Sequence, residues 1–126
     1  MKGIYSLLIH LSKGKNIKVG KLGIFHFPEG YYIYVGSAMN GIEQRVTRHK
    51  RKEKKKRWHI DYLLEEAEVI DVFIKGNVKR KEECKTVNEW IKKGGKILVK
   101  GFGSSDCKCE THLLYFGKSF FKIKKK

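Results

Sequence analysis

Apolar and polar residues alternate over several short stretches of the chain, a pattern typical of β-strands with one buried face. These stretches are rich in Ile, Val, Tyr and Phe, and a Pro-Glu-Gly turn precedes one of them. The pattern predicts strands over residues 3–11, 31–37, 69–75 and 96–102, and a hairpin with arms 17–19 and 23–27.

Apolar positions spaced three and four residues apart indicate the helices between these strands. Ile60, Leu63, Leu64 and Ala67 follow this spacing, and Gly94-Gly95 suits the C-terminal cap of a helix over 81–93. Further helices are predicted from Asn40-Gly41 to His49 and over 110–116. Interleaved elements within 126 residues predict one α/β (α+β) domain over 1–126, with a small, mainly antiparallel mixed sheet flanked by helices.

The charge of the chain favours an anionic partner. It has 29 Lys and Arg against 13 Asp and Glu, a net charge of +16 that attracts polyanions. Two segments concentrate this charge, a basic loop over 50–57 and a basic C-terminal tail over 118–126. Nucleic acid is the partner we expect, although an anionic membrane surface or a role in solubility alone would also suit the charge.

Hydropathy and cysteine content exclude other classes. No stretch approaches the ~18 apolar residues of a membrane span, and the first residues become polar too soon for a secretory signal. Three cysteines, two of them in a Cys-x-Cys arrangement, do not suit a disulfide framework. We therefore expect reduced thiols, a cytoplasmic protein and no membrane partner.

Two tyrosines lie in predicted strands close to glycines, Tyr5 in Gly3-Ile4-Tyr5 and Tyr34 in Tyr34-Val35-Gly36. Glycine within or at the end of a strand often marks the close approach of another backbone or of a ligand. On the following helix, Arg45, Arg48 and His49 share one face. Guanidinium groups on such a face suit a phosphate, because arginine offers paired donors to its oxygens.

A carboxylate on the helix over 81–93 is also unusual. Glu83 shares a stripe with Val87 and Trp90, so its side chain turns toward the packed side of the helix. A carboxylate in that position needs an arginine or a cation as its partner, and a hard divalent ion is one candidate. The plain alternative is that Glu83 only favours the helix dipole from the first turn.

Together these residues resemble the two signatures of the GIY-YIG nuclease superfamily. The stretches YYIYVGSAMNGIEQRVTRHKR, RWHIDYLL, EEC and GFGSSDCKCETHLLYF are similar to a small GIY-YIG-related family, some of whose members are fused to endonuclease III. The 28 residues between Tyr5 and Tyr34 exceed the usual separation of the two signatures. We interpret the hairpin as an insertion that leaves the tyrosines adjacent in the sheet. Ser104, Ser105 and Asp106 lie nearest to the position of the superfamily's late asparagine.

The resemblance implies metal-assisted hydrolysis of phosphodiester bonds. Tyr34, or Tyr5 beside it, would take a proton from the attacking water with help from His49, because a free tyrosine titrates only near ~10. Arg45 would stabilise charge on the phosphate. The implied catalytic set is Tyr5, Tyr34, Arg45, His49 and His59, and Glu83 would hold Mg²⁺ or Mn²⁺.

The basic block would hold the nucleic-acid backbone without reading its sequence. Trp58, next to this block, could stack on an unpaired base. DNA is favoured over RNA as the substrate, and the endonuclease III fusions indicate a role in DNA repair. The predicted phosphate contacts are Arg48, Lys50, Arg51, Lys54, Lys55, Lys56 and Arg57.

A second group of residues could bind a different metal. Cys107, Cys109 and His112, with Cys84 as a further candidate, are ligand types that zinc prefers. Their spacing is less specific than two Cys-x-x-Cys pairs, and cysteines also fill buried positions as small apolar residues.

Three functions therefore stay open. The first is a divalent-metal-dependent endonuclease, which requires Tyr5, Tyr34, Arg45 and Glu83 to converge. The second is a nucleic-acid-binding module on the same fold without catalysis, and the third is a Cys/His structural interaction domain that partners a repair enzyme.

Overall fold

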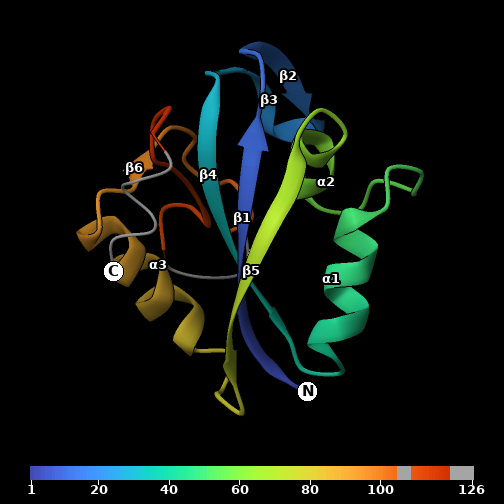
Figure 1. Cartoon of the computed structure of the whole chain (residues 1–126), viewed down its shortest axis with the longest axis vertical. Helices are drawn as coiled ribbons and strands as arrows, with labels where there is room; N and C mark the ends of the chain where they lie inside the picture. The colour runs from blue at the N-terminus through green and yellow to red at the C-terminus, as the bar shows by residue number, and fades with distance from the viewer. Residues whose placement is uncertain (105–108, 120–126) are drawn as a thin grey trace.

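The computed structural model describes residues 1–104 and 109–119, and its centre is a five-stranded sheet in the order β5-β1-β4-β7-β6 (Figure 1). Every neighbouring pair in this sheet is antiparallel. The strands are β1 (Gly3–Leu11), β4 (Gly30–Ala38), β5 (Glu68–Gly76), β6 (Lys96–Ile97) and β7 (Leu113–Tyr115), and the helices are α1 (Ile42–Lys50), α2 (His59–Leu64) and α3 (Glu82–Lys92). The predicted α+β class with a mainly antiparallel sheet is confirmed.

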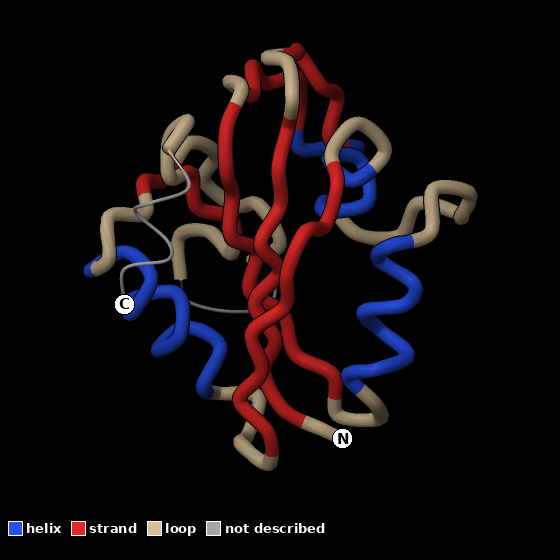
Figure 2. Tube along the Cα trace, in the orientation of Figure 1, coloured by secondary structure: helices blue, strands red, loops and turns tan. Residues whose placement is uncertain are grey.

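Helices cover the sheet on both sides, α1 and α2 on one side and α3 on the other (Figure 2). Alternate residues of β1 therefore enter two different cores. Tyr5 and Leu7 pack with the α1 and α2 side, whereas Ile4 and Leu8 pack with Trp90 of α3. Because both faces of β1 are covered, this strand is buried along nearly its whole length.

The predicted hairpin is confirmed as a separate two-stranded sheet. It consists of β2 (Lys15–Val19) and β3 (Gly23–Phe27), joined by the short 3-10 helix η1 (Gly20–Leu22), and it packs against α2. The hairpin connects the end of β1 to the start of β4, where Leu11 pairs with Gly30. Tyr34 lies in the middle of the same ladder and Tyr5 lies nearer its other end, so the insertion does not separate them.

Two predictions near the C-terminus are wrong. Residues 110–116 were predicted as a helix, but Leu113–Tyr115 form β7, and the strand predicted over 96–102 shrinks to β6. Leu113 packs into one core and Leu114 into the other, so the segment lacks the polar face that would reveal a strand by its periodicity. In the segment predicted as a strand over 96–102, Gly101 has a φ of +83° and lies in a turn, which a strand cannot include.

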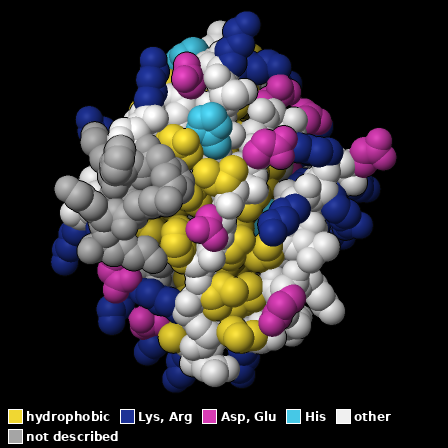
Figure 3. Space-filling view, in the orientation of Figure 1, with side chains coloured by type: hydrophobic (Ala, Val, Ile, Leu, Met, Phe, Trp, Pro, Cys, Tyr) yellow, Lys and Arg dark blue, Asp and Glu magenta, His cyan; other side chains and the backbone are white. Residues whose placement is uncertain are grey.

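The surface combines a broad basic periphery with a small apolar area. Figure 3 shows Lys and Arg side chains around the outline of one face and apolar side chains near its centre. Ile70 and Ile74 of β5 are among the exposed apolar residues. Residues 120–126 of the predicted basic tail lie outside the described residues, whereas Lys118 is described and exposed. Within the described ranges, no helix has the length and apolar content needed to cross a membrane.

Candidate functional site

The two signature tyrosines lie on the same face of the sheet. Tyr5 of β1 pairs with Gly36 of β4, and Tyr34 pairs with Leu7, so the tyrosines are diagonal neighbours across the ladder. A Cβ atom at Gly36 would lie 2.5 Å from the Tyr5 hydroxyl and ring. Glycine is required here because the tyrosine ring lies directly on the backbone of β4. This arrangement agrees with the expectation that the hairpin leaves the tyrosines adjacent.

His49 of α1 contacts the tyrosine pair from above the sheet. Tyr5 Oη and His49 Nε2 are 2.8 Å apart, and the Tyr34 ring meets the imidazole edge-on with centroids 6.1 Å apart. Burial lowers the pKa of His49 to about 3, so the imidazole is neutral at physiological pH. Burial also raises the pKa of Tyr5 to about 12, against the lowering effect of Arg45. The proton therefore rests on the tyrosine in the free protein.

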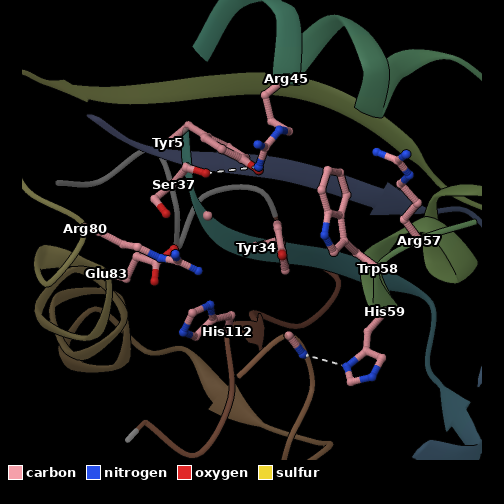
Figure 4. A pocket seen from close by; sticks show the side chains of 12 residues that line it. Tyr5, Tyr34, Ser37, Arg45, Arg57, Trp58, His59, Arg80, Glu83 and His112 are labelled. Atoms are coloured by element: carbon pink, nitrogen blue, oxygen red, sulfur yellow. Dashed lines mark hydrogen bonds between the residues drawn. The ribbon is translucent and has the colours of Figure 1, made fainter. Parts of the chain in front are cut away.

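Arg45 reaches over the tyrosines from the middle of α1. Its Nη1 donates a hydrogen bond to the Ser37 carbonyl at 3.1 Å, and its guanidinium lies 4.6 Å from the centre of the Trp58 ring (Figure 4). The carbonyl and the ring fix the side chain in place and leave other donors of the guanidinium for a ligand.

A pocket of about 180 Å³ opens between these residues and the start of α3. β4 pairs with β7 only from Tyr32 to Tyr34, which leaves the far end of β4 accessible to this pocket from the side of α3. Figure 4 shows the labelled side chains arranged around one space. The pocket is lined by Tyr5, Tyr34, Gly36, Ser37, Arg45, Arg57, Trp58, His59, Arg80, Glu83, Gly103 and His112.

Glu83 is the acidic residue among these lining side chains. It lies in the first turn of α3 and is 9% exposed, and it shares its buried stripe with Val87 and Trp90, as the sequence indicates. Among the residues that the structure describes, its carboxylate has neither a hydrogen bond nor an ion pair. Its carboxylate faces the pocket and is open to a cation or to water that enters from there.

His59 lies at the edge of the pocket rather than at its centre. Its Nδ1 accepts a hydrogen bond from the backbone N–H of Gly103 at 2.8 Å, and burial lowers its pKa. The imidazole is thereby fixed as a neutral tautomer with Nε2 protonated, which suits a hydrogen-bond donor better than a general base.

Two lining residues extend the set that the sequence predicted for this site. Arg80 lies in the turn just ahead of α3, three residues before Glu83, and is exposed at the mouth of the pocket; only this short spacing from Glu83 could have pointed to it. His112 was predicted as a zinc ligand, yet it also lines the pocket because β7 runs beside β4.

Arg48, predicted to contact phosphate, binds a carboxylate of its own chain. Its guanidinium donates two hydrogen bonds of 3.0 Å to the two oxygens of Asp61, which is buried. Burial alone would raise the pKa of Asp61, but hydrogen bonds from Arg48 and from the backbone of Arg57 and Trp58 hold it below its usual value. Arg48 is thus occupied by a structural ion pair.

Some side chains of the basic loop contact the rest of the chain, and most of them are exposed. Lys54 donates to the carbonyls of Arg48 and His49, and Lys56 forms an ion pair with Glu65. The exposed members of the predicted set are Lys50, Arg51, Lys55, Lys56 and Arg57.

The cysteines differ from the expected reduced thiols. Cys84 and Cys109 form a disulfide, although 25 positions separate them, because the fold places the start of α3 beside the segment that precedes β7. His112 completes a group of three metal-ligating side chains whose ligand atoms lie within 4.8 Å of one another. Cys107, a predicted zinc ligand, lies outside the described residues, as do Ser105 and Asp106 near the position of the superfamily's late asparagine.

Comparison with known proteins gives a family but no activity. A protein-family model described as "Domain of unknown function DUF123" matches residues 4–125. No curated protein and no solved structure matches the chain.

Proposed function

The chain belongs to the DUF123 family, and we propose that it is a GIY-YIG-like endonuclease that depends on a divalent metal and cleaves DNA in preference to RNA. One observation carries this proposal. Tyr5, Tyr34, Arg45 and Glu83 come from four separate elements, β1, β4, α1 and α3, and line one pocket. This arrangement supports the proposal, because the chemistry that we propose needs the four side chains around one phosphate.

Glu83 fits the ligand that Mg²⁺ or Mn²⁺ prefers. It offers carboxylate oxygens and has no cationic partner within hydrogen-bond distance among the described residues. A single carboxylate suffices for Mg²⁺, since this ion keeps several waters and shares the oxygens of a substrate phosphate. When bound, the metal would stabilise charge on the scissile phosphate and on the leaving oxygen.

Arg45 would bind the scissile phosphate from the opposite side of the pocket. The Ser37 carbonyl and the Trp58 ring hold its guanidinium in advance, so little side-chain entropy is lost when a phosphate arrives. Arg80 would add a second positive charge at the pocket mouth, where the non-scissile part of the strand would run.

The pair Tyr5 and His49 would move the proton of the attacking water. In the tautomer with Nε2 unprotonated, His49 would accept the Tyr5 hydroxyl proton across 2.8 Å while the Tyr5 oxygen takes a proton from the attacking water, so that no free phenolate has to form. Tyr34, on the same face, would orient that water. A phosphate in the pocket adds negative charge, which raises the pKa of His49, the final acceptor of the water proton in this relay.

The exposed cations of the basic loop would hold the rest of the nucleic acid. Lys50, Arg51, Lys55 and Arg57 are exposed on the segment that leads from α1 toward the pocket. Such contacts bind phosphates of any sequence and weaken as salt rises.

A non-catalytic nucleic-acid-binding module is the second candidate. Burial raises the pKa of both Tyr5 and Tyr34, so neither is a phenolate in the free protein. If His49 does not accept the proton, the same pocket and the same basic surface would bind nucleic acid without cleaving it.

The two candidates can be separated by cleavage assays on labelled branched, nicked and single-stranded DNA and RNA with Mg²⁺ or Mn²⁺. We expect Glu83→Gln to reduce cleavage by at least about 100-fold, the usual cost of removing one electrostatic contact to the transition state. Glu82→Gln is the matched control, because Glu82 is the preceding residue of the same helix and does not line the pocket.

Binding without cleavage by the wild type, unchanged in both variants, would establish the binding module instead. Equal cleavage by the wild type and Glu83→Gln would overturn the metal ligand that we propose.

A further inference from the structure

Three metal-ligating side chains, Cys84, Cys109 and His112, meet next to the pocket of the tyrosines, which His112 also lines. Cys84 follows Glu83 in the first turn of α3, and Cys109 and His112 lie just before β7. His112 Nε2 and Cys109 Sγ are 3.0 Å apart, and the ligand atoms of all three residues lie within 4.8 Å of one another.

These distances suit a tetrahedral zinc site. Zinc bonds of roughly 2.3 Å to sulfur and 2.0–2.1 Å to nitrogen place neighbouring ligand atoms roughly 3.5–3.8 Å apart. Once the disulfide is reduced, small side-chain movements are enough to bring the three ligand atoms to this separation. The fourth position would be filled by water.

The surroundings of the three residues also fit a metal site. His112 is 4% exposed, and its backbone carbonyl accepts a hydrogen bond of 2.9 Å from the Val35 N–H, which fixes the segment that carries the imidazole. Cys84 and Cys109 line a groove of about 360 Å³ that is distinct from the pocket of the tyrosines. The groove gives an ion a path from solvent to the two sulfurs.

We propose that Cys84, Cys109 and His112 bind one Zn²⁺ ion when the disulfide is reduced, and that the disulfide and the zinc complex are alternative states of this site. A dithiol would supply the two electrons and two protons that open the disulfide, and would itself become a disulfide. Zinc binding then releases the two thiol protons, so that each cysteine ligates as a thiolate.

The charge and the type of the ligands show that this site would select a different metal ion from the one proposed at Glu83. Two thiolates and a neutral imidazole cancel the charge of Zn²⁺, which suits a site in a chain of net charge +16. Soft sulfur ligands select zinc, whereas the oxygens of Glu83 suit Mg²⁺ or Mn²⁺. In both of its states the site would tie the start of α3, which carries Glu83, to the strand beside Tyr34.

Cobalt titration tests the proposal without any nucleic acid, so the result does not depend on whether the pocket cleaves. The protein is reduced with a dithiol, freed of it under anaerobic conditions and titrated with Co²⁺. We expect a thiolate-to-cobalt absorption band that saturates at about one ion per chain and disappears when Zn²⁺ is added. The oxidised protein should give no band.

Variants then assign the ligands. We expect Cys84→Ala and His112→Ala to weaken Co²⁺ binding by more than about 100-fold, since a lost direct ligand costs more than a lost supporting contact. His26→Ala is the matched control, because His26 is an exposed histidine of β3 and should leave the titration unchanged. Failure of the reduced wild type to bind Co²⁺, or unchanged binding by Cys84→Ala, would overturn the proposal.

Discussion

Acid should destabilise this protein through His49, by an amount that follows from its burial. The imidazole is 2% exposed, and its pKa is about 3 in the folded protein against 6.5 for a free histidine. Between these two values the unfolded chain binds a proton at residue 49 that the folded protein does not bind. The free energy of unfolding therefore falls as the pH drops from 6.5 toward 3.

The size of the effect is large compared with the stability of a small domain. Linkage with the two pKa values of His49 gives a loss of about 3 kcal/mol between pH 7 and pH 4. Solvent screening reduces this little, because the side chain is buried. A typical domain has only about 5–15 kcal/mol of total stability, so the loss is readily measured.

Urea unfolding of the wild type and of His49→Gln at pH 7 and pH 4, at fixed ionic strength, isolates this contribution. Glutamine keeps a polar side chain near the Tyr5 hydroxyl and does not titrate. Other acid-sensitive groups, such as Asp61, are common to both proteins and cancel in the comparison. We expect the wild type to lose about 3 kcal/mol more than the variant. Parallel losses, within about 1 kcal/mol, would refute the neutral His49 on which the proposed proton transfer depends.

Three further predictions concern packing and charge. Gly36→Ala should cost about 1–3 kcal/mol in urea unfolding, because its Cβ would lie 2.5 Å from the tyrosine ring of β1, and an unchanged midpoint would contradict that close approach. Arg48→Ala should cost about 3–5 kcal/mol by leaving the carboxylate of Asp61 buried and unpaired. The exposed control Arg51→Ala should stay within about 0.5 kcal/mol, and equal effects of the two would argue against the ion pair. Replacing both Arg51 and Lys55 with glutamine should make the plot of log affinity for duplex DNA against log salt shallower by about 1.8, and an unchanged slope would show that these two charges contact no phosphate.

The sequence is informative where the hydrophobic pattern and local spacing determine the structure. The strand that holds Tyr5, the hairpin after it and the helix that holds Glu83 all follow from periodicity and turn residues, and each is observed. The inward turn of Glu83 also follows, because a stripe at i, i+4 and i+7 needs only the helix to form.

The errors arise where long-range contacts determine the structure. The disulfide joins Cys84 to a segment 25 residues away, and the partner of Arg48 is Asp61, 13 residues further along. No local pattern indicates either pairing. The segment 110–116 is too short and too apolar for its periodicity to distinguish a strand from a helix, and only its pairing with β4 makes it a strand.

The strand order has a consequence for the sequence of events during synthesis. The first 76 residues contain β1, β4, β5, α1 and α2, and thus Tyr5, Tyr34 and Arg45 with the basic loop. Glu83 and His112 emerge from the ribosome only later, and β7 closes the sheet last. Because domains form as their elements become available, a nascent chain would possess the cationic surface before it possesses the carboxylate that the proposed chemistry needs. Under the proposed function, growing chains would thus hold nucleic acid before they were able to cleave it.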